Sequence, residues 1–518
     1  MAAKTIMIQG TASHVGKSVL VAALCRIFLQ DGYKVAPFKS QNMALNSFVT
    51  KEGGEMGRAQ VVQAEAAGLE PSVDMNPLLL KPTGQSSSQV IVLGKPVGNL
   101  SAVQYHREYA PKALKIIEEA LSRLRSAYDI VVIEGAGSPA EVNLQDKEIV
   151  NMRIARMADA PVLLVADIDK GGALAAVVGT LELISPTDRE RVAGILINKF
   201  RGELQLFRPA IDFLEKKTEK RVLGVVPYFH GLRIQEEDTV SEDRDRAEQV
   251  EENGWVEIAV VHLPHISNFT DFDPLESEPD VKLHYVGNGR RLGNPDLIIL
   301  PGSKNTIGDL AFLNRSGLSA QIIECSRRGV PVIGICGGFQ MLGRELNDPL
   351  HMESEIPRVE GMGLLDVTTI FAADKVTTQV EAEVAGAGLF LSGFPSQRIK
   401  GYEIHMGRTE LHSGAKPAFT ILVRSGKKVF FPDGAVSMDG LVFGTYIHGI
   451  FDNDEFRRHI VNTLRKKKGL ETLKSTSSIT TSEQRHRDFE KLAAIVRGSL
   501  DMARIYEIMG MEQPANAG

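Results

Sequence analysis

The feature that most constrains this chain is the segment VPVIGICGGFQ at residues 330–340, where a short apolar run ends at a cysteine between glycines. Such a run predicts a buried strand, and the glycines around Cys336 allow the sharp turn that lifts a side chain off the strand end. A helix from Phe339 onward would direct its first N–H groups toward Cys336 and stabilise a thiolate. A lone cysteine is usually a buried structural residue. Because a turn of this kind has no packing purpose, we interpret Cys336 as a nucleophile.

A nucleophilic thiol needs a base, and the sequence offers His448 in the stretch TYIHG at residues 445–449, after another β-rich run. The oxyanion that forms when a thiolate attacks an amide also needs N–H donors. Gly302 lies in a PGS turn between an apolar strand, residues 297–300, and a predicted helix. We therefore predict that the backbone N–H groups of Gly302 and Gly337 form the oxyanion and glutamine-binding site.

The start of the chain carries a second chemical motif. Residues 5–8 predict a strand, GTASHVGKS follows at residues 10–18, and an apolar helix is predicted at residues 19–28. This order indicates a P-loop, although the loop has one residue more between its glycines than the common pattern. Its backbone N–H groups would wrap nucleotide phosphates, the lysine would neutralise their charge, and the serine hydroxyl would ligate Mg²⁺. The predicted nucleotide-binding residues are Thr11, Gly16, Lys17 and Ser18.

Three further polar residues follow apolar strands, at the carboxyl ends where open α/β sheets bind ligands. Lys39 is either a surface lysine or a second, catalytic cation that faces the phosphates. Glu134 ends the run at residues 129–133 and is predicted as the second Mg²⁺ ligand, with helix capping as the alternative. Asn198 is predicted to hydrogen-bond the purine edge of the nucleotide.

The alternation of strands and helices predicts an α/β fold with two doubly wound domains. At 518 residues the chain is too long for one core. We predict an ATP-dependent domain at residues 1–235, an acidic linker at residues 236–254 and a second α/β domain at residues 255–455. A helical extension is predicted at residues 456–518. Its apolar face, at residues 485–509, would pack on a core or on another subunit of a homo-oligomer.

Composition narrows the class of protein. The net charge of -6 and the absence of a long basic tract argue against nucleic-acid binding, so the partners should be small molecules or other subunits. The three cysteines have no spacing typical of a metal site or a disulfide framework, which fits a reducing cytoplasm. No apolar segment is long enough to span a bilayer, and the N-terminus does not resemble a signal peptide.

The chemistries of the two predicted sites complement each other: one activates a carboxylate and the other releases ammonia. A P-loop with Mg²⁺ and ATP can phosphorylate a carboxylate, which gives an acyl phosphate that an amine attacks. Free ammonia is scarce at neutral pH because it is mostly protonated. A thiolate with a histidine can release ammonia from the side-chain amide of L-glutamine through a thioester. The combination predicts an ATP- and glutamine-dependent amidoligase.

These motifs resemble known families. The P-loop with EGAGS at residues 134–138 is similar to the dethiobiotin synthetase-type ATP domain, and ICGG with YIHG is similar to class I glutamine amidotransferases. The fusion of the two domains resembles the cobyric acid synthase (CobQ/CbiP) family over nearly the whole chain. The stretches FKSQNMALNS, GYEIHMG and GTYIHGIFDN also carry this resemblance. The resemblance implies a corrinoid substrate, adenosylcobyrinic acid a,c-diamide, which would be amidated on its b, d, e and g side chains in cobalamin biosynthesis.

The resemblance also assigns residues. It implies Cys336 as the nucleophile and His448 as its base. The wider amidotransferase class has a glutamate two residues after the histidine, and here that position is Ile450. Either Glu403 or another acid therefore orients the imidazole, or the site works as a dyad. Asp146 is a further candidate, for handling the phosphorylated intermediate.

The sequence alone leaves three other interpretations of the function open. Cobyrinic acid a,c-diamide synthase shares the architecture, but the stretch QNMALN after Lys39 favours the cobyric acid enzyme. CTP synthase joins the same pair of domains, but Ile450 counts against it. A ParA- or MinD-like partitioning ATPase would leave Cys336 and His448 without a role, and the loop lacks the additional lysine near Gly10 that such switches use.

Overall fold

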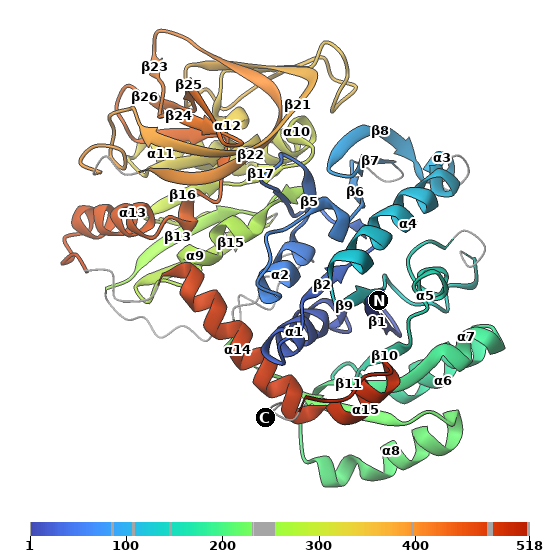
Figure 1. Ribbon diagram of the computed structural model, residues 1–518. Helices are drawn as coiled ribbons and strands as arrows, with labels where there is room; N and C mark the ends of the chain where they lie inside the picture. Colours follow the sequence, from blue (N-terminus) through green and yellow to red (C-terminus); the bar gives the residue numbers. More distant parts are fainter. Residues whose placement is uncertain are drawn as a thin grey trace.

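The computed structural model describes residues 2–83, 87–105, 109–143, 148–229, 231–232, 254–287, 289–394, 398–473 and 480–514. Two α/β units stand one above the other, and the last helices of the chain return to the first unit (Figure 1). The predicted linker at residues 236–254 lies outside the described residues except for Gly254. The predicted domain boundaries therefore stay predictions, while the α/β class of both units is confirmed.

The first unit is built on a six-stranded parallel sheet in the order β12-β11-β10-β1-β9-β2. The strands are β1 (Lys4–Gly10), β2 (Val35–Phe38), β9 (Ile130–Glu134), β10 (Val162–Asp167), β11 (Val192–Phe200) and β12 (Val222–Pro227). β9 and β10 are buried along their whole length, as expected for runs of β-branched residues covered on both faces. The P-loop strand β1 lies between them, so the loops after β1 and β9 meet at one edge of the sheet.

Helices cover both faces of this sheet, which makes it doubly wound. One apolar core joins α1 to the last helices of the chain, and a second core lies on the other face. The predicted helix at residues 19–28 is present and longer than expected. The helices of the unit are α1 (Lys17–Gln30), α2 (Arg58–Ala66), α4 (Ala110–Ala127), α5 (Met152–Ala158), α6 (Ala173–Leu183), α7 (Pro186–Arg191) and α8 (Leu204–Thr218).

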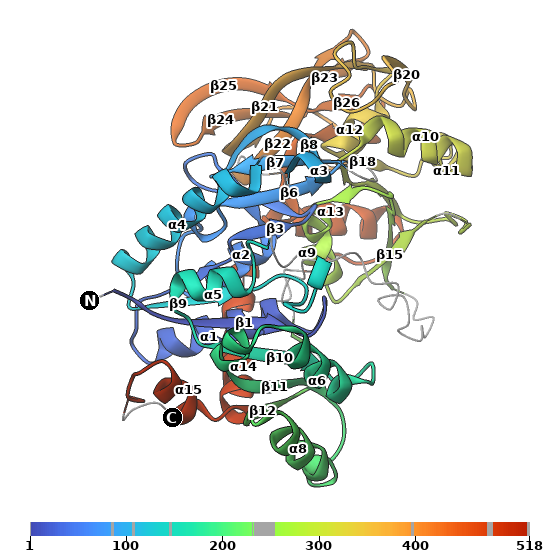
Figure 2. The ribbon, with the colours of Figure 1, turned by 90° about the vertical axis from the view of Figure 1, so that its right-hand side faces the viewer.

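Residues 41–101 form strands that we did not predict. A mixed four-stranded sheet has the order β3-β6-β7-β8, and a hairpin joins β4 to β5. Both views place these strands between the parallel sheet and the second unit (Figures 1 and 2). The strands are short and contain several polar residues, which hides the period-2 pattern. Their bounds are β3 (Gln41–Met43), β4 (Ser47–Val49), β5 (Glu55–Gly57), β6 (Leu78–Pro82), β7 (Ser87–Val92) and β8 (Lys95–Ser101).

The second unit has a central sheet in the order β15-β13-β16-β18-β27-β26-β23, whose first five strands are parallel. The seven strands of this sheet are β13 (Val256–Val261), β15 (Val281–Val286), β16 (Leu297–Leu300), β18 (Val332–Ile335), β27 (Val442–Thr445), β26 (Ala435–Ser437) and β23 (Ala415–Lys416). A second sheet is built around the long hairpin of β21 (Val367–Val384) and β22 (Ile399–Leu411), which pairs with β28 (Ile447–His448). β18, which precedes Cys336, lies in the middle of the central sheet.

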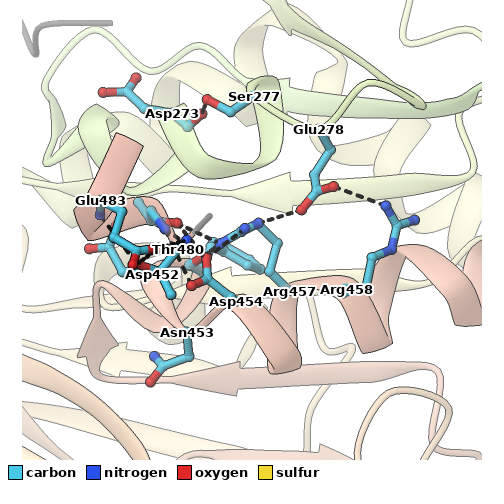
Figure 3. Close-up of polar contacts among 12 residues, drawn as sticks. Asp273, Ser277, Glu278, Asp452, Asn453, Asp454, Arg457, Arg458, Thr480 and Glu483 are labelled. Atoms are coloured by element: carbon cyan, nitrogen blue, oxygen red, sulfur yellow. Dashed lines mark hydrogen bonds and ion pairs between the residues drawn. The ribbon is translucent and has the colours of Figure 1, made fainter. Parts of the chain in front are cut away.

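The predicted helical extension is three helices, α13 (Asp454–Lys467), α14 (Thr481–Ser499) and α15 (Met502–Ile508). Arg457 and Arg458 of α13 both bind Glu278 of the second unit, at 2.7 and 2.9 Å, and Thr480 caps α14 (Figure 3). The predicted apolar face at residues 485–509 packs on α1 and β12 of the first unit. Of the two expected partners, a core or another subunit, this face therefore packs on a core of its own chain.

The predicted apolar face at residues 485–509 is divided between α14 and α15, because the helix breaks at Leu500, whose backbone forms a β-bridge with Gly224. A side chain on Gly224 would collide with the Leu500 backbone and side chain, so the glycine permits this close approach. None of the described helices combines the length and the apolar character that a membrane crossing requires.

Candidate active sites

The P-loop connects β1 to α1 as predicted. Gly16 has φ 94°, and a Cβ at this position would lie 2.1 Å from the Asn198 amide nitrogen, so both backbone and space require glycine. The Lys17 Nζ donates to the carbonyl oxygens of Ala12, at 3.0 Å, and Gly137, at 3.2 Å. The lysine thus spans the loop where phosphate oxygens would accept its hydrogen bonds.

Glu134, at the end of β9, collects donors from three elements. Its Oε1 accepts from Ser18 Oγ at 2.8 Å and from Lys39 Nζ at 2.9 Å, and its Oε2 accepts from Gln63 Nε2. Burial raises the pKa of Glu134, but the Lys39 charge and these hydrogen bonds outweigh burial and hold the pKa below its usual value. Glu134 is therefore a carboxylate at neutral pH. The structure brings together the predicted Ser18, Glu134 and Lys39.

A hydroxyl and a carboxylate on adjacent loops are the donor set that Mg²⁺ takes in nucleotide sites, with phosphate oxygens and waters completing the octahedron. Ser18 Oγ and Glu134 Oε1 meet this requirement. In the described part of the chain no cluster of three or more His, Cys, Asp or Glu side chains forms a separate metal site. Ser18 and Glu134 thus fit the Mg²⁺ of a magnesium–nucleotide complex.

Asn198 lies beside the P-loop, as predicted, but its amide nitrogen donates to Val15 O at 2.8 Å. This bond fixes the loop backbone. The side-chain oxygen Oδ1 of Asn198 is buried and has no hydrogen-bond partner among the described residues, so a base contact by this atom stays a prediction. The Thr11 N–H donates to Val165 O at 2.9 Å, which anchors the start of the loop. Asp146 lies outside the described residues.

Sequence reasoning missed two buried amides, Gln60 and Gln63 on α2. Gln60 Nε2 lies 3.5 Å from Glu134 Oε2 and its Oε1 accepts from Asn42. The signal was present: two glutamines at i and i+3 lie on one face of a helix, next to apolar residues that must be buried.

Cys336 follows β18 and precedes α12 (Gly337–Leu342). Its φ of 51° and ψ of -109° are strained for a residue with a side chain, as a nucleophile on a sharp strand-to-helix turn requires. The Cys336 N–H donates to Thr445 O at 2.8 Å, and a Cβ at Gly338 would lie 2.1 Å from Leu300 O. The predicted turn is therefore present, and the glycine serves close approach to the neighbouring strand.

His448 stands beside this thiol with a carboxylate behind it. His448 Nδ1 lies 2.7 Å from Asp271 Oδ2, and the Gly449 N–H donates to Asp271 Oδ1 at 3.1 Å. Burial lowers the pKa of His448, but the charge of Asp271, its hydrogen bond and the hydrogen bond to Cys336 outweigh burial and raise the pKa to about 10. The imidazole is therefore protonated at neutral pH, and cysteine, histidine and aspartate form one chain of contacts.

The two predicted oxyanion residues flank this group. A Cβ at Gly302 would lie 3.1 Å from His448 Cε1, and a Cβ at Gly337 would lie 2.9 Å from the backbone nitrogen of Ser303. Gly302 belongs to the short strand β17 (Gly302–Ser303), which pairs with β14 (Ile266–Ser267). The backbone after β16 and the backbone after Cys336 thus approach each other beside the imidazole, as expected for donors on both sides of an oxyanion.

Of the alternatives weighed for orienting the imidazole, the structure supports another acid. The Glu403 carboxylate pairs with Arg424, at 3.0 and 3.1 Å, and the Nδ1 partner of His448 is Asp271. Asp271 belongs to the short helix η5 (Phe269–Phe272), 177 residues before the histidine. Sequence reasoning missed it because no fixed spacing links the two. The available signal was an acid shortly after a strand end, in the stretch NFTDFDP.

Comparison with known proteins identifies the families of both units. Residues 6–240 match the model of the CobQ/CobB/MinD/ParA nucleotide binding domain, and residues 257–456 match that of the CobB/CobQ-like glutamine amidotransferase domain. The cobyric acid synthase of Pelotomaculum thermopropionicum is 56% identical over 99% of this chain and 98% of its own length. That of Moorella thermoacetica is also 56% identical, over 99% and 98%. That of Desulfitobacterium hafniense is 52% identical over 99% of both chains. The chain belongs to the cobyric acid synthase family.

Proposed function

We propose that this chain amidates the b, d, e and g carboxylates of adenosylcobyrinic acid a,c-diamide, with ATP as the source of activation and L-glutamine as the source of nitrogen. The observation that carries the proposal is the presence of two complete sites in one chain. One is the cysteine of a strained turn with His448 and Asp271. The other is a P-loop whose Ser18 meets Glu134.

In the second unit, the Cys336 sulfur passes its proton to His448 and attacks the side-chain amide carbon of glutamine. The protonated His448 gives its proton to the departing nitrogen. Burial lowers the pKa of His448, but Asp271 and Cys336 outweigh burial and raise this pKa to about 10. Ammonia leaves and a thioester remains on Cys336. Water then attacks the thioester, which yields glutamate and frees the thiol. The N–H groups of Gly302 and Gly337 are proposed to bind the oxyanion in both steps.

In the first unit, an oxygen of the corrinoid carboxylate attacks the γ-phosphorus of ATP and ADP leaves, which gives an acyl phosphate. Ammonia attacks the acyl carbon, loses a proton, and phosphate leaves. Lys17 and Lys39 supply positive charge near the transferred group, and Ser18 and Glu134 would hold Mg²⁺. When bound, Mg²⁺ would neutralise phosphate charge during transfer. Each amide formed consumes one ATP and one glutamine.

The test is mass spectrometry of the corrinoid after incubation with ATP and glutamine, since each conversion of a carboxylate to an amide lowers the mass by about one unit. Cys336→Ala should abolish glutamine-dependent amidation, while ammonia at raised pH still supports it. Lys17→Ala should stop amidation from both nitrogen sources, because the phosphates lose a charged ligand. No mass change with the wild-type protein, or amidation by Lys17→Ala at the wild-type rate, would overturn the proposal.

We further propose that the chain works in the cytoplasm. Its three cysteines are all free, as expected in a reducing compartment, and ATP and glutamine are both supplied there. Recovery of the native protein with its activity in the soluble cytoplasmic fraction of its host is the matching observation, and recovery only outside it would contradict the proposal.

A further inference from the structure

The carboxylate that orients His448 is held by residues of the other unit. Asp271 lies in η5, a helix of one turn that starts after Asn268, a residue in the left-handed region with φ 53°. The Asn268 side chain does not cap this helix. The Phe269 N–H donates instead to Asn46 Oδ1 at 3.1 Å, over a separation of 223 residues. An asparagine from the first unit thus accepts from the first N–H group of the helix, one of the donors that a helix end leaves without an intrahelical partner.

A second contact runs in the opposite direction. The Ser47 N–H donates to Asn268 Oδ1 at 3.0 Å, so consecutive residues of the first unit bind consecutive residues before Asp271. Asn46, Ser47 and Asn268 are each no more than 2% exposed. Because buried backbone N–H groups that lose their acceptor are costly, the turn that carries Asp271 depends on these two bonds.

Asn268 and Ser47 also contact the tyrosine that packs on the imidazole of His448. Asn268 Nδ2 donates to the Tyr402 hydroxyl at 3.3 Å, and this hydroxyl donates to Ser47 O at 3.4 Å. The Tyr402 ring stacks on the His448 imidazole, with 5.4 Å between ring centroids and 17° between ring planes. Residues 46–47 therefore contact both supports of His448. One is η5, which carries the hydrogen-bonding Asp271, and the other is Tyr402, which packs against the face of the imidazole.

We propose that Asn46, of the first unit, is a positioning residue for glutamine hydrolysis in the second unit, acting with Asn268 on Asp271 and His448. Asn46 lies seven residues after Lys39, which binds Glu134 at the P-loop. One segment of chain therefore touches both active sites, and the glutaminase site is complete only when this segment is docked. The inference rests on the proposed function and adds a residue to its glutamine-dependent half.

The experiment compares glutaminase and ammonia-dependent amidation in the full chain. Asn46→Ala should lower the kcat for glutamine hydrolysis about tenfold or more, since one buried hydrogen bond to the turn is lost. The KM for glutamine and the ammonia-dependent rate should stay within about twofold. The alkaline limb of the glutaminase kcat should move to lower pH, because a less firmly held Asp271 lowers the pKa of the His448 imidazolium. Asn46→Ser, which keeps an oxygen acceptor, should restore part of the kcat.

Gln379→Ala is the matched control. Gln379 Nε2 donates to Val49 O at 2.9 Å, which is also a hydrogen bond between the units but does not end on η5. Its kcat should equal that of the wild type. Should Asn46→Ala fail to fold, Asn268→Asp replaces it. Aspartate tolerates the left-handed conformation and keeps the acceptor for Ser47 but loses the donor to Tyr402, so kcat should again fall.

Two outcomes overturn the inference. One is a wild-type kcat in Asn46→Ala. The other is an equal loss of glutaminase and ammonia-dependent activity with an unmoved pH profile, which is the result of general destabilisation. Cys336→Ala, measured in parallel, separates this inference from the proposed function: if it retains glutaminase, the assignment of the site itself is wrong, whatever Asn46→Ala does.

Discussion

Asp271 and His448 lie 2.7 Å apart between Oδ2 and Nδ1, although 177 residues separate them in the sequence. The position two residues after the histidine, where an acid would be expected, is the buried Ile450. The carboxylate thus comes from η5, near the start of the second unit, and not from position 450, which follows β28 near its end. The contact between imidazole and acid therefore depends on the fold and not on a fixed spacing in the sequence, as in triads on unrelated folds.

The first prediction is that Asp271→Asn lowers the kcat for glutamine hydrolysis on the order of 10³-fold, because the amide neither fixes the imidazole tautomer nor stabilises its protonated form. The rate of ammonia-dependent amidation should stay unchanged. Steady-state assays with each nitrogen source measure both values. Glu403→Gln is the comparison: if it, rather than Asp271→Asn, abolishes hydrolysis, then Glu403 orients the site.

The second prediction concerns Glu134, whose carboxylate contacts Ser18 and Lys39. Glu134→Gln keeps the size of the side chain but removes its charge. Amidation should fall about a hundredfold with either nitrogen source, and the Mg²⁺ concentration for half-maximal rate should rise. Titrations of Mg²⁺ at saturating ATP measure this shift. Glutaminase activity measured without ATP should be unaffected, and a selective loss of glutaminase would contradict the assignment.

The sequence was most informative where one local pattern carries the chemistry. The strand, glycine-rich turn and helix around Lys17 and around Cys336 are contiguous, so their geometry follows from backbone rules that neighbours alone determine. Asp271, Gln63 and Asn46 are different, because each reaches its partner through the packing of separate elements. Their roles depend on tertiary distance, which no spacing in a single sequence encodes.

The strands at residues 41–101 were missed for a related reason. They are short, and Glu55 of β5 and Lys81 of β6 are wholly buried. A reader of the sequence assigns charged residues to the surface, because charges are seldom buried without a partner. Here Glu55 pairs with Lys81 of its own unit and with Lys375 of the other unit. Neither pair can be read from the spacing of these residues in the sequence.

The third prediction concerns Asp433, which is 4% exposed at the end of β25 (Lys427–Asp433). Burial, and then the nearby charge of Glu403, raise its pKa from 3.8 to about 7. Between these values the folded protein holds a proton that the unfolded chain has released, so stability should fall as pH rises from about 4 to about 7.

The Tyr446 N–H donates to Asp433 Oδ1 at 3.2 Å. Asp433→Asn removes the titration of the carboxyl group but keeps an oxygen that can accept this hydrogen bond. The stability of the variant relative to the wild type should therefore rise between pH 5 and pH 8, by on the order of 3 kcal/mol. Scanning calorimetry at these two pH values measures the difference in Tm. A constant difference across the range would show that Asp433 does not titrate in this window.

The last prediction concerns the ion pairs between the units. Glu55 binds Lys81 of its own unit at 2.9 Å and Lys375 of the second unit at 2.5 Å, and these side chains are at most 5% exposed. Burial raises the pKa of Glu55, but the two lysines outweigh burial and lower it, so the carboxylate is charged. Burial also lowers the pKa of Lys375 to about 8, against the attraction of Glu55.

Glu55→Ala should destabilise the chain by about 3–5 kcal/mol, because removing one partner leaves two lysines buried without their carboxylate. The Tm should fall by roughly 10 °C. Lys51→Ala is the matched control: Lys51 pairs with Glu70 at 2.8 Å, but both side chains are more than 60% exposed, so its loss should change Tm by about 1 °C or less. Equal effects of the two variants would mean that the buried pair does not hold the units together. A larger effect of Glu55→Ala, with both activities lost in parallel on heating, is the expected result, because the segment that carries Asn46 is docked through the same contact region.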